Sequence, residues 1–171
     1  MQPVKVRIEE LIRKLGLLDH PEGGFFRETY RSKGVISSGE LGQDFKGDRN
    51  YSTAIYFLLT SDNFSAFHRI RQDETWHFYE GSEIVLHLLS PSGSYEQVIL
   101  GGDIGRGHHF QYVVQAGTWF ASEVREPDNY ALAGCTVAPG FDFDDFELAN
   151  RQELQEQYPS FRDLIGRLTR T

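Results

Sequence analysis

Residues Phe64 to Gly81 read FSAFHRIRQDETWHFYEG, and this stretch decides the fold. Aromatic and β-branched residues on both sides of Gln72-Asp73 predict a hairpin with strands over Phe64–Arg71 and Glu74–Glu80. Alternate side chains of a strand point to the same face of its sheet. The first strand therefore has one face with Phe64, Ala66, His68 and Ile70, which we expect to be the interior, and another with Ser65, Phe67, Arg69 and Arg71.

The second strand of the hairpin is expected to bring a carboxylate to the same interior. Its inner face carries Glu74, Trp76 and Phe78, while Thr75, His77 and Tyr79 point outward. If both inner faces line one cavity, His68 and Glu74 meet there among aromatic side chains, as polar groups do in small-molecule sites. The alternative is a His–Glu pair that only satisfies its own hydrogen bonds inside the molecule.

The rest of the central region has the same β texture. Runs rich in Val, Ile, Tyr and Phe, separated by Gly, Pro, Asp and Asn, predict further strands over Phe25–Arg31, Tyr51–Leu59, Glu83–Leu89, Tyr95–Leu100, His108–Val114, Thr118–Val124 and Tyr130–Val137. Many short strands without intervening helices indicate a mainly β sandwich or barrel.

Helical periodicity is confined to the two ends of the chain. Apolar residues at helical spacing from Val4 to Leu15 predict an amphipathic helix that stops at Gly16, and the tail after Phe146 predicts two short helices. Residues 32–50 are rich in glycine and poor in apolar residues, which predicts a long flexible loop. With 171 residues and no linker, we expect a single domain over 1–171.

Composition excludes several classes of function. The formal net charge is −8 and no Lys/Arg run occurs, which argues against a nucleic-acid partner. Charged residues near the N-terminus and the lack of a long apolar stretch argue against a signal peptide and a membrane span, so a soluble cytoplasmic protein is expected. Cys135 is the only cysteine, which rules out an intrachain disulfide and favours a buried, inert thiol.

Three blocks of sequence carry a resemblance to a known family. From His68 onward, Glu74 and Gly81 keep the spacing of the first cupin motif, and VQAGTWF at 114–120 resembles the second motif weakly. HPEGGFFRETY at 20–30, HRIRQDETWHFYEG at 68–81 and GCTVAPGFDFDDFE at 134–147 resemble the uncharacterised cupin 5 family, formerly a domain of unknown function. The resemblance implies a cupin double-stranded β-helix, jelly-roll-like, related to germin-like and dTDP-sugar epimerase-like cupins, and a homodimer.

The resemblance also bears on metal binding. In metal-binding cupins the ligands are two histidines and the glutamate of the first motif and the histidine of the second. Here His68 and Glu74 match, whereas Ile70 and Phe120 stand at the other two positions. Transition metals are usually held by at least three protein ligands. We therefore expect no cofactor, with a weakly bound divalent metal at His68 and Glu74 as the alternative.

Several other residues are candidates for the site. Arg27 could clamp an anionic ligand group, or form a surface ion pair. Trp76, Tyr56 and Trp119 could line the pocket, or simply belong to the core. His77 is a secondary candidate, because strict alternation puts it on the outer face unless a bulge at Glu74 reverses it. The segment Pro139 to Phe146 mixes aromatics with acids and could pack across a barrel mouth.

Three functions remain open on this reading. The first is binding of a small metabolite in the barrel pocket, with the ligand unidentified. The second is a metal-independent sugar-nucleotide epimerase or isomerase, with His68 as general base and Glu74 or a tyrosine completing the proton transfer. The third is a structural or interaction dimer with a vestigial pocket, favoured if the cavity proves too small or wholly apolar. Fold analogy alone does not separate them. The homodimer itself is expected from the resemblance and from outward apolar residues such as Phe67 and Tyr79.

Overall fold

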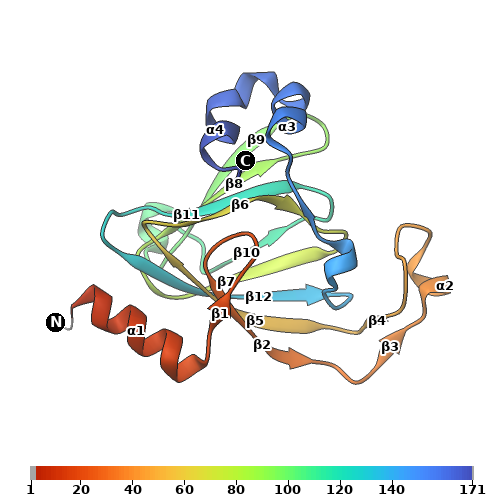
Figure 1. The fold of residues 1–171 in the computed structure, drawn as a ribbon, viewed down its shortest axis with the longest axis horizontal. Coiled ribbons are helices and arrows are strands. Elements are labelled where there is room, and N and C mark those ends of the chain that lie inside the picture. The colour runs from red at the N-terminus through yellow and green to blue at the C-terminus, as the bar shows by residue number, and fades with distance from the viewer. Residues whose placement is uncertain (1–2, 171) are drawn as a thin grey trace.

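Two antiparallel sheets packed face to face form the centre of the computed structural model, which describes residues 3–170 (Figure 1). The six-stranded sheet has the order β1 (Leu18–Asp19), β2 (Phe25–Arg31), β5 (Thr53–Thr60), β12 (Tyr130–Ala138), β7 (Asp73–Gly81) and β10 (Gln111–Val114). The five-stranded sheet has the order β13 (Glu147–Leu148), β6 (Phe64–Arg69), β11 (Trp119–Val124), β8 (Ile84–Leu89) and β9 (Tyr95–Leu100). The predicted mainly β fold is confirmed.

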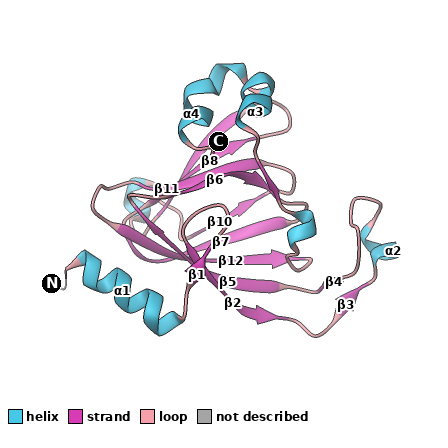
Figure 2. Cartoon of the chain, viewed as in Figure 1, coloured by secondary structure: helices cyan, strands magenta, loops and turns pink. Residues whose placement is uncertain are grey.

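Helices cover the outer faces of both sheets, at opposite sides of the molecule (Figure 2). Helix α1 (Val4–Leu15) buries Leu11 against Leu58 of β5 and Leu132 of β12, and it ends at Gly16, whose φ is 62°. Helices α3 (Arg151–Gln157) and α4 (Arg162–Arg167) cover β6 and β11. None of the helices within residues 3–170 has the length and apolar character that crossing a bilayer requires.

The core lies between the two sheets because each sheet turns one apolar face inward. Phe57 of β5 and Trp76 of β7 meet edge to face, with ring centroids 5.5 Å apart, and Trp76 also meets Phe120 of β11. All three side chains are buried. Phe57 belongs to this core and also lines the cavity described below.

Strand β6 contains a bulge that changes the predicted alternation. His68 pairs with Phe120 and Ser65 pairs with Ser122, so two residues of β6 face the single Ala121 of β11. Ser65 and His68 consequently point to the same side, whereas Phe64 packs with the C-terminal helices. The inward position of His68 is confirmed, but the prediction that Phe64 shares its face and Ser65 opposes it is wrong. An extra residue in a strand reverses the alternation beyond it.

Two further predictions need correction. The glycine-rich segment 32–50 forms short elements, β3 (Val35–Ile36), α2 (Ser38–Leu41) and β4 (Arg49–Asn50), with β3 paired to β4. Phe67, expected on an outer face that could form a dimer, is buried beneath α3 and α4. Tyr79 is half exposed, as expected. The homodimer stays a prediction, which light scattering at micromolar concentration would test.

Candidate functional site

A cavity of about 230 Å³ lies between the inner face of the six-stranded sheet and the end of β6. Side chains from β2, β5, β6, β7 and β12 form its walls, and the segments around residues 20–22 and 141–146 complete them. The lining comprises His20, Glu22, Phe26, Glu28, Arg31, Thr53, Ile55, Phe57, His68, Ile70, Glu74, Cys135, Val137, Phe141, Asp142, Phe143 and Phe146. The sequence pattern correctly placed His68 and Glu74 in one cavity, although a role for either in ligand binding or catalysis stays a prediction.

The buried partner of His68 is Glu22. His68 Nε2 lies 3.0 Å from Glu22 Oε2, and His68 Nδ1 lies 2.7 Å from the carbonyl oxygen of Ala66. Ser65 Oγ donates to the other carboxylate oxygen at 2.8 Å, which is a consequence of the bulge in β6. Both imidazole nitrogens thus face acceptors, so the ring is best satisfied when both carry protons.

Burial and charge oppose each other in this pair. Burial by itself lowers the pKa of His68, but the charge and hydrogen bond of Glu22 outweigh it and raise the pKa above 6.5. Burial raises the pKa of Glu22, but the charge and hydrogen bond of His68 lower it by more, so the pKa lies below 4.5. The two shifts and the acceptors at both ring nitrogens favour an imidazolium paired with a carboxylate. An imidazolium has no lone pair to accept a proton, which counts against His68 as a general base.

Glu74 is a different kind of carboxyl group. It is buried, it lines the cavity, and it takes part in none of the ion pairs of residues 3–170. Burial raises its pKa to about 7, assisted by the charge of Glu22, while His68 and a hydrogen bond with Cys135 act in the opposite direction. A carboxyl group with this pKa can either donate or accept a proton near neutral pH.

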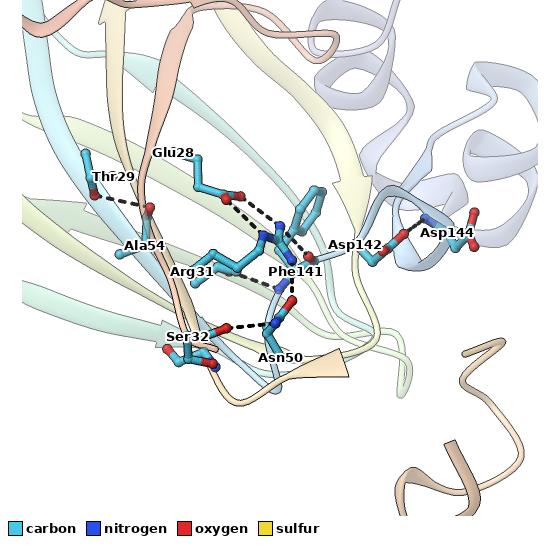
Figure 3. Close-up of polar contacts among 12 residues, drawn as sticks. Glu28, Thr29, Arg31, Ser32, Asn50, Ala54, Phe141, Asp142 and Asp144 are labelled. Atoms are coloured by element: carbon cyan, nitrogen blue, oxygen red, sulfur yellow. Dashed lines mark hydrogen bonds and ion pairs between the residues drawn. The ribbon is translucent and has the colours of Figure 1, made fainter. Parts of the chain in front are cut away.

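The mouth of the cavity is held by Arg31 (Figure 3). Its guanidinium donates twice to the Glu28 carboxylate, at 2.9 and 2.8 Å, once to Asn50 Oδ1 at 2.9 Å and once to the Phe141 carbonyl oxygen at 3.1 Å. These bonds join the end of β2 to β4 and to the segment that follows β12. Arg31 therefore fixes the wall of the cavity, and four of its five N–H donors are already engaged.

An aromatic segment closes the same end. Phe141, Phe143 and Phe146 lie edge to face with one another, with ring centroids 5.0 to 6.4 Å apart. His20 contacts Phe143 and Phe146 from the other side, and Phe146 also faces His68 at 5.4 Å. The expectation that residues 139–146 pack across an opening of the fold agrees with these contacts.

The other candidates from the sequence are not among the residues that line the cavity, although Trp76 contacts Phe57 and Glu74 of its wall. Trp76 and Trp119 are core residues, the latter beneath the C-terminal helices with Arg69 stacked over it. Tyr56 faces α1, and Arg27 donates to the carbonyl oxygen of Leu15 at the end of that helix. His77 contacts Thr136 Oγ1 at 3.1 Å on the outer side of the sheet, as strict alternation predicts. Next to two of these residues, the adjacent residue in the chain does line the cavity: Ile55 beside Tyr56, and Glu28 beside Arg27.

Six polar residues of the cavity were not predicted as site residues: Thr53, Asp142 and four near the N-terminal end of the chain, His20, Glu22, Glu28 and Arg31. The signal for the last four lies in one stretch of sequence. His20, Glu22 and Glu28 belong to the block HPEGGFFRETY at 20–30, which carries the family resemblance, and Arg31 directly follows it. Its density of charged and aromatic residues after a Gly-Gly turn was the available signal. Alternation along β2 shows which residues share a face of the strand, but it does not show which face points inward. That depends on how the strand pairs and packs in the fold.

The residues present do not fit the metal centre of metal-binding cupins. Ile70 and Phe120 offer no ligand atoms at two of the four positions. His68 also has both ring nitrogens engaged, with Ala66 and Glu22. Among residues 3–170, no group of three or more His, Cys, Asp and Glu side chains is arranged to hold a metal ion.

Comparisons with known proteins show the family of the chain. Residues 9–149 match the family model described as cupin superfamily (DUF985). A hypothetical protein of Leishmania major is 34% identical, covers 95% of this chain and 98% of its own, and superposes with a TM-score of 0.87. A protein of Shewanella oneidensis is 35% identical over 99% of both chains, with a TM-score of 0.87. The uncharacterized protein YML079W of Saccharomyces cerevisiae is 34% identical over 81% of this chain and 73% of its own.

More distant structures share the fold alone. Oxalate decarboxylase of Bacillus subtilis superposes with a TM-score of 0.53 at 11% identity, over 88% of this chain and 36% of that enzyme. At that identity the superposition carries no information about chemistry. The relatives above 30% identity are themselves described as uncharacterized or hypothetical, or by source alone.

Proposed function

Because the chain belongs to the cupin superfamily, in the family DUF985, we propose that it binds a small metabolite in the cavity between its sheets. The observation that carries the proposal is Glu74, a buried carboxyl group that faces the cavity outside any of the ion pairs of residues 3–170. A buried ionisable group costs stability unless it is paired, so such groups are concentrated at functional sites. A vestigial pocket would gain nothing from a buried carboxyl group that lowers the stability of the fold.

The size of the cavity limits the ligand. A volume of about 230 Å³ corresponds to roughly eight water molecules at liquid density. A compound with about ten non-hydrogen atoms fits this space, whereas a whole sugar nucleotide does not. The wall is mostly apolar, with polar groups at the inner end and at the mouth. A compact ligand with a largely apolar body and one polar end suits this lining best.

Acid–base catalysis is a second candidate, and Glu74 favours it. Its pKa of about 7 matches the condition for efficient proton transfer near neutral pH. In this candidate Glu74 exchanges the proton, while His68, whose two ring nitrogens are engaged by Ala66 and Glu22, acts on the ligand only through its charge. Glu74 thus takes the role of base that the sequence had assigned to His68.

Ligand binding is tested by a thermal-shift screen of metabolites. A ligand present at a hundred times its Kd stabilises the native state by about 2.7 kcal/mol, or about 5 to 10 °C in melting temperature for a domain of this size. Ile55→Trp should abolish this shift, because its side chain lines the cavity and the indole would fill it. Tyr56→Phe is the matched control on the opposite face of β5. An equal shift in the Ile55→Trp protein would place the ligand elsewhere.

Glu74→Gln is expected to stabilise the protein at pH 8 by about 1 to 3 kcal/mol. Because the folded-state pKa of about 7 exceeds the usual 4.5, folding takes up a proton between these values, and stability falls as the pH rises through that range. Glutamine keeps the shape without the charge. Denaturant titrations at pH 5 and pH 8 measure the effect, and the exposed Glu9→Gln is the control. Destabilisation at pH 8 would refute the assigned protonation.

A further inference from the structure

The ion pairs of the cavity leave an excess of negative charge. Four carboxyl groups line it, Glu22, Glu28, Glu74 and Asp142, against the two cationic groups Arg31 and His68. Arg31 neutralises Glu28 and His68 neutralises Glu22, at distances of 2.8 and 3.0 Å. Glu74 and Asp142 form no ion pair within residues 3–170. Asp142 Oδ1 accepts from the backbone nitrogen of Asp144, and the charge of Asp142 acts on Arg31 and Arg49 only from a greater distance.

The third potential cation of the lining is neutral. His20 Nδ1 accepts a hydrogen bond from the backbone nitrogen of Glu22 at 3.3 Å, so this nitrogen carries no proton. Its ring lies among Phe26, Phe57, Phe143 and Phe146. An anionic ligand would therefore find little free cationic surface, since Arg31 has four of its five N–H donors engaged by Glu28, Asn50 and Phe141.

Aromatic rings surround the same space. Phe26 and Phe57 stand on the sheet, and Phe141, Phe143 and Phe146 close the mouth. Ring faces carry negative electrostatic potential and attract organic cations, most strongly where water is excluded. A cage of rings with carboxylates at one end is the arrangement that recognises alkylammonium groups. The net charge of −8 of the whole chain further raises the local concentration of cations.

From this combination we infer that the cavity selects a small organic cation, an amine or quaternary ammonium compound, with its apolar part among the phenylalanines and its charge directed at Glu74. The inference rests on the proposed function and narrows its ligand class. It separates the cavity from sites for phosphorylated or carboxylated metabolites, which require free cationic side chains.

The test compares ligands that differ only in charge. Choline and 3,3-dimethylbutan-1-ol share shape and hydroxyl group, and 2-phenylethylammonium and 2-phenylethanol form a second pair. Calorimetric titration at pH 8 and low salt is expected to give at least about tenfold tighter binding of the cation in one pair or both. Pivalate, an anion of similar bulk, is expected not to bind.

Three variants locate the effect. Glu74→Gln should reduce the affinity for the cation by about tenfold and change that for the neutral partner by less than about twofold. Phe143 is a half-exposed ring at the mouth. Phe143→Leu should also reduce the affinity for the cation more than that for the neutral partner, because leucine keeps the bulk without the ring face. Ile55→Trp should remove binding of both members of a pair.

The outcomes separate this inference from the proposed function. If a neutral member or pivalate binds as tightly as its cation, and Ile55→Trp abolishes that binding, the cavity is a ligand site but not a cation site. If no member of either pair binds at millimolar concentration, the cation inference is overturned, and the metabolite screen decides the proposed function by itself.

Discussion

Replacing Asp145 by alanine is expected to destabilise the protein by about 3 to 5 kcal/mol, because it leaves a buried guanidinium without its counter-ion. Asp145 is buried and accepts from Arg49 Nε and Nη2 at 2.7 and 2.8 Å. Gln72 Nε2 donates to the same carboxylate at 2.6 Å. Arg49 is itself buried, so water cannot replace the lost partner.

The same change should open the cavity. Asp145 ends the 3-10 turn Phe143–Asp145 that carries part of the aromatic wall, and Arg49 belongs to β4. Breaking their ion pair releases this wall from β4, so ligand affinity should fall together with stability.

Urea unfolding gives the free energies, and Asp144→Ala on the exposed side of the same turn is the control. The double variant Arg49→Met/Asp145→Leu should recover much of the loss, because two apolar side chains remove the unpaired charge. A loss below about 1 kcal/mol for Asp145→Ala would contradict the role of this pair as a buried anchor.

Glu22→Gln is the second change with a large expected effect, a loss of about 2 to 4 kcal/mol at pH 6. His68 is charged in the unfolded chain at this pH, and without Glu22 it must either bury an uncompensated charge or release its proton. The pKa of His68 is raised in the wild type. In the variant it should fall below 6.5, because burial lowers it and the charge of Glu22 no longer outweighs burial. Proton NMR of the imidazole measures this pKa directly.

The dependence on pH follows from the signs of the two shifts. The raised pKa of His68 contributes stability that is present below 6.5 and is lost as the pH rises through the folded-state value. The lowered pKa of Glu22 contributes stability that is present above 4.5 and is lost as the pH falls through its folded-state value. The difference between wild type and Glu22→Gln should therefore be largest between pH 4.5 and 6.5.

Glu28→Gln is the matched control, because its ion pair with Arg31 is partly exposed and should be worth about 0 to 1 kcal/mol. A Glu22→Gln protein with wild-type stability and an unchanged His68 titration would show that the imidazole has another source of charge stabilisation.

Much of the fold could be predicted because the signals are local. The strands Phe25–Arg31 and Tyr95–Leu100 have the predicted bounds, and so does the helix from Val4 to Leu15. Strand β7 alternates as predicted, with Trp76 in the core and His77 outside. Periods of two and of 3.6 residues follow from backbone geometry, and they are visible in any window of the sequence.

The sequence by itself thus determined the cupin-like sandwich and the inward positions of His68 and Glu74. Only the tertiary structure decided that Glu22 is the partner of His68, that Ser65 joins them through a bulge, and that Arg31 and the rings of 141–146 complete the cavity. These contacts join segments 43 to 110 residues apart. Partners at such separations are selected by sheet register and packing, which no periodicity within one strand records.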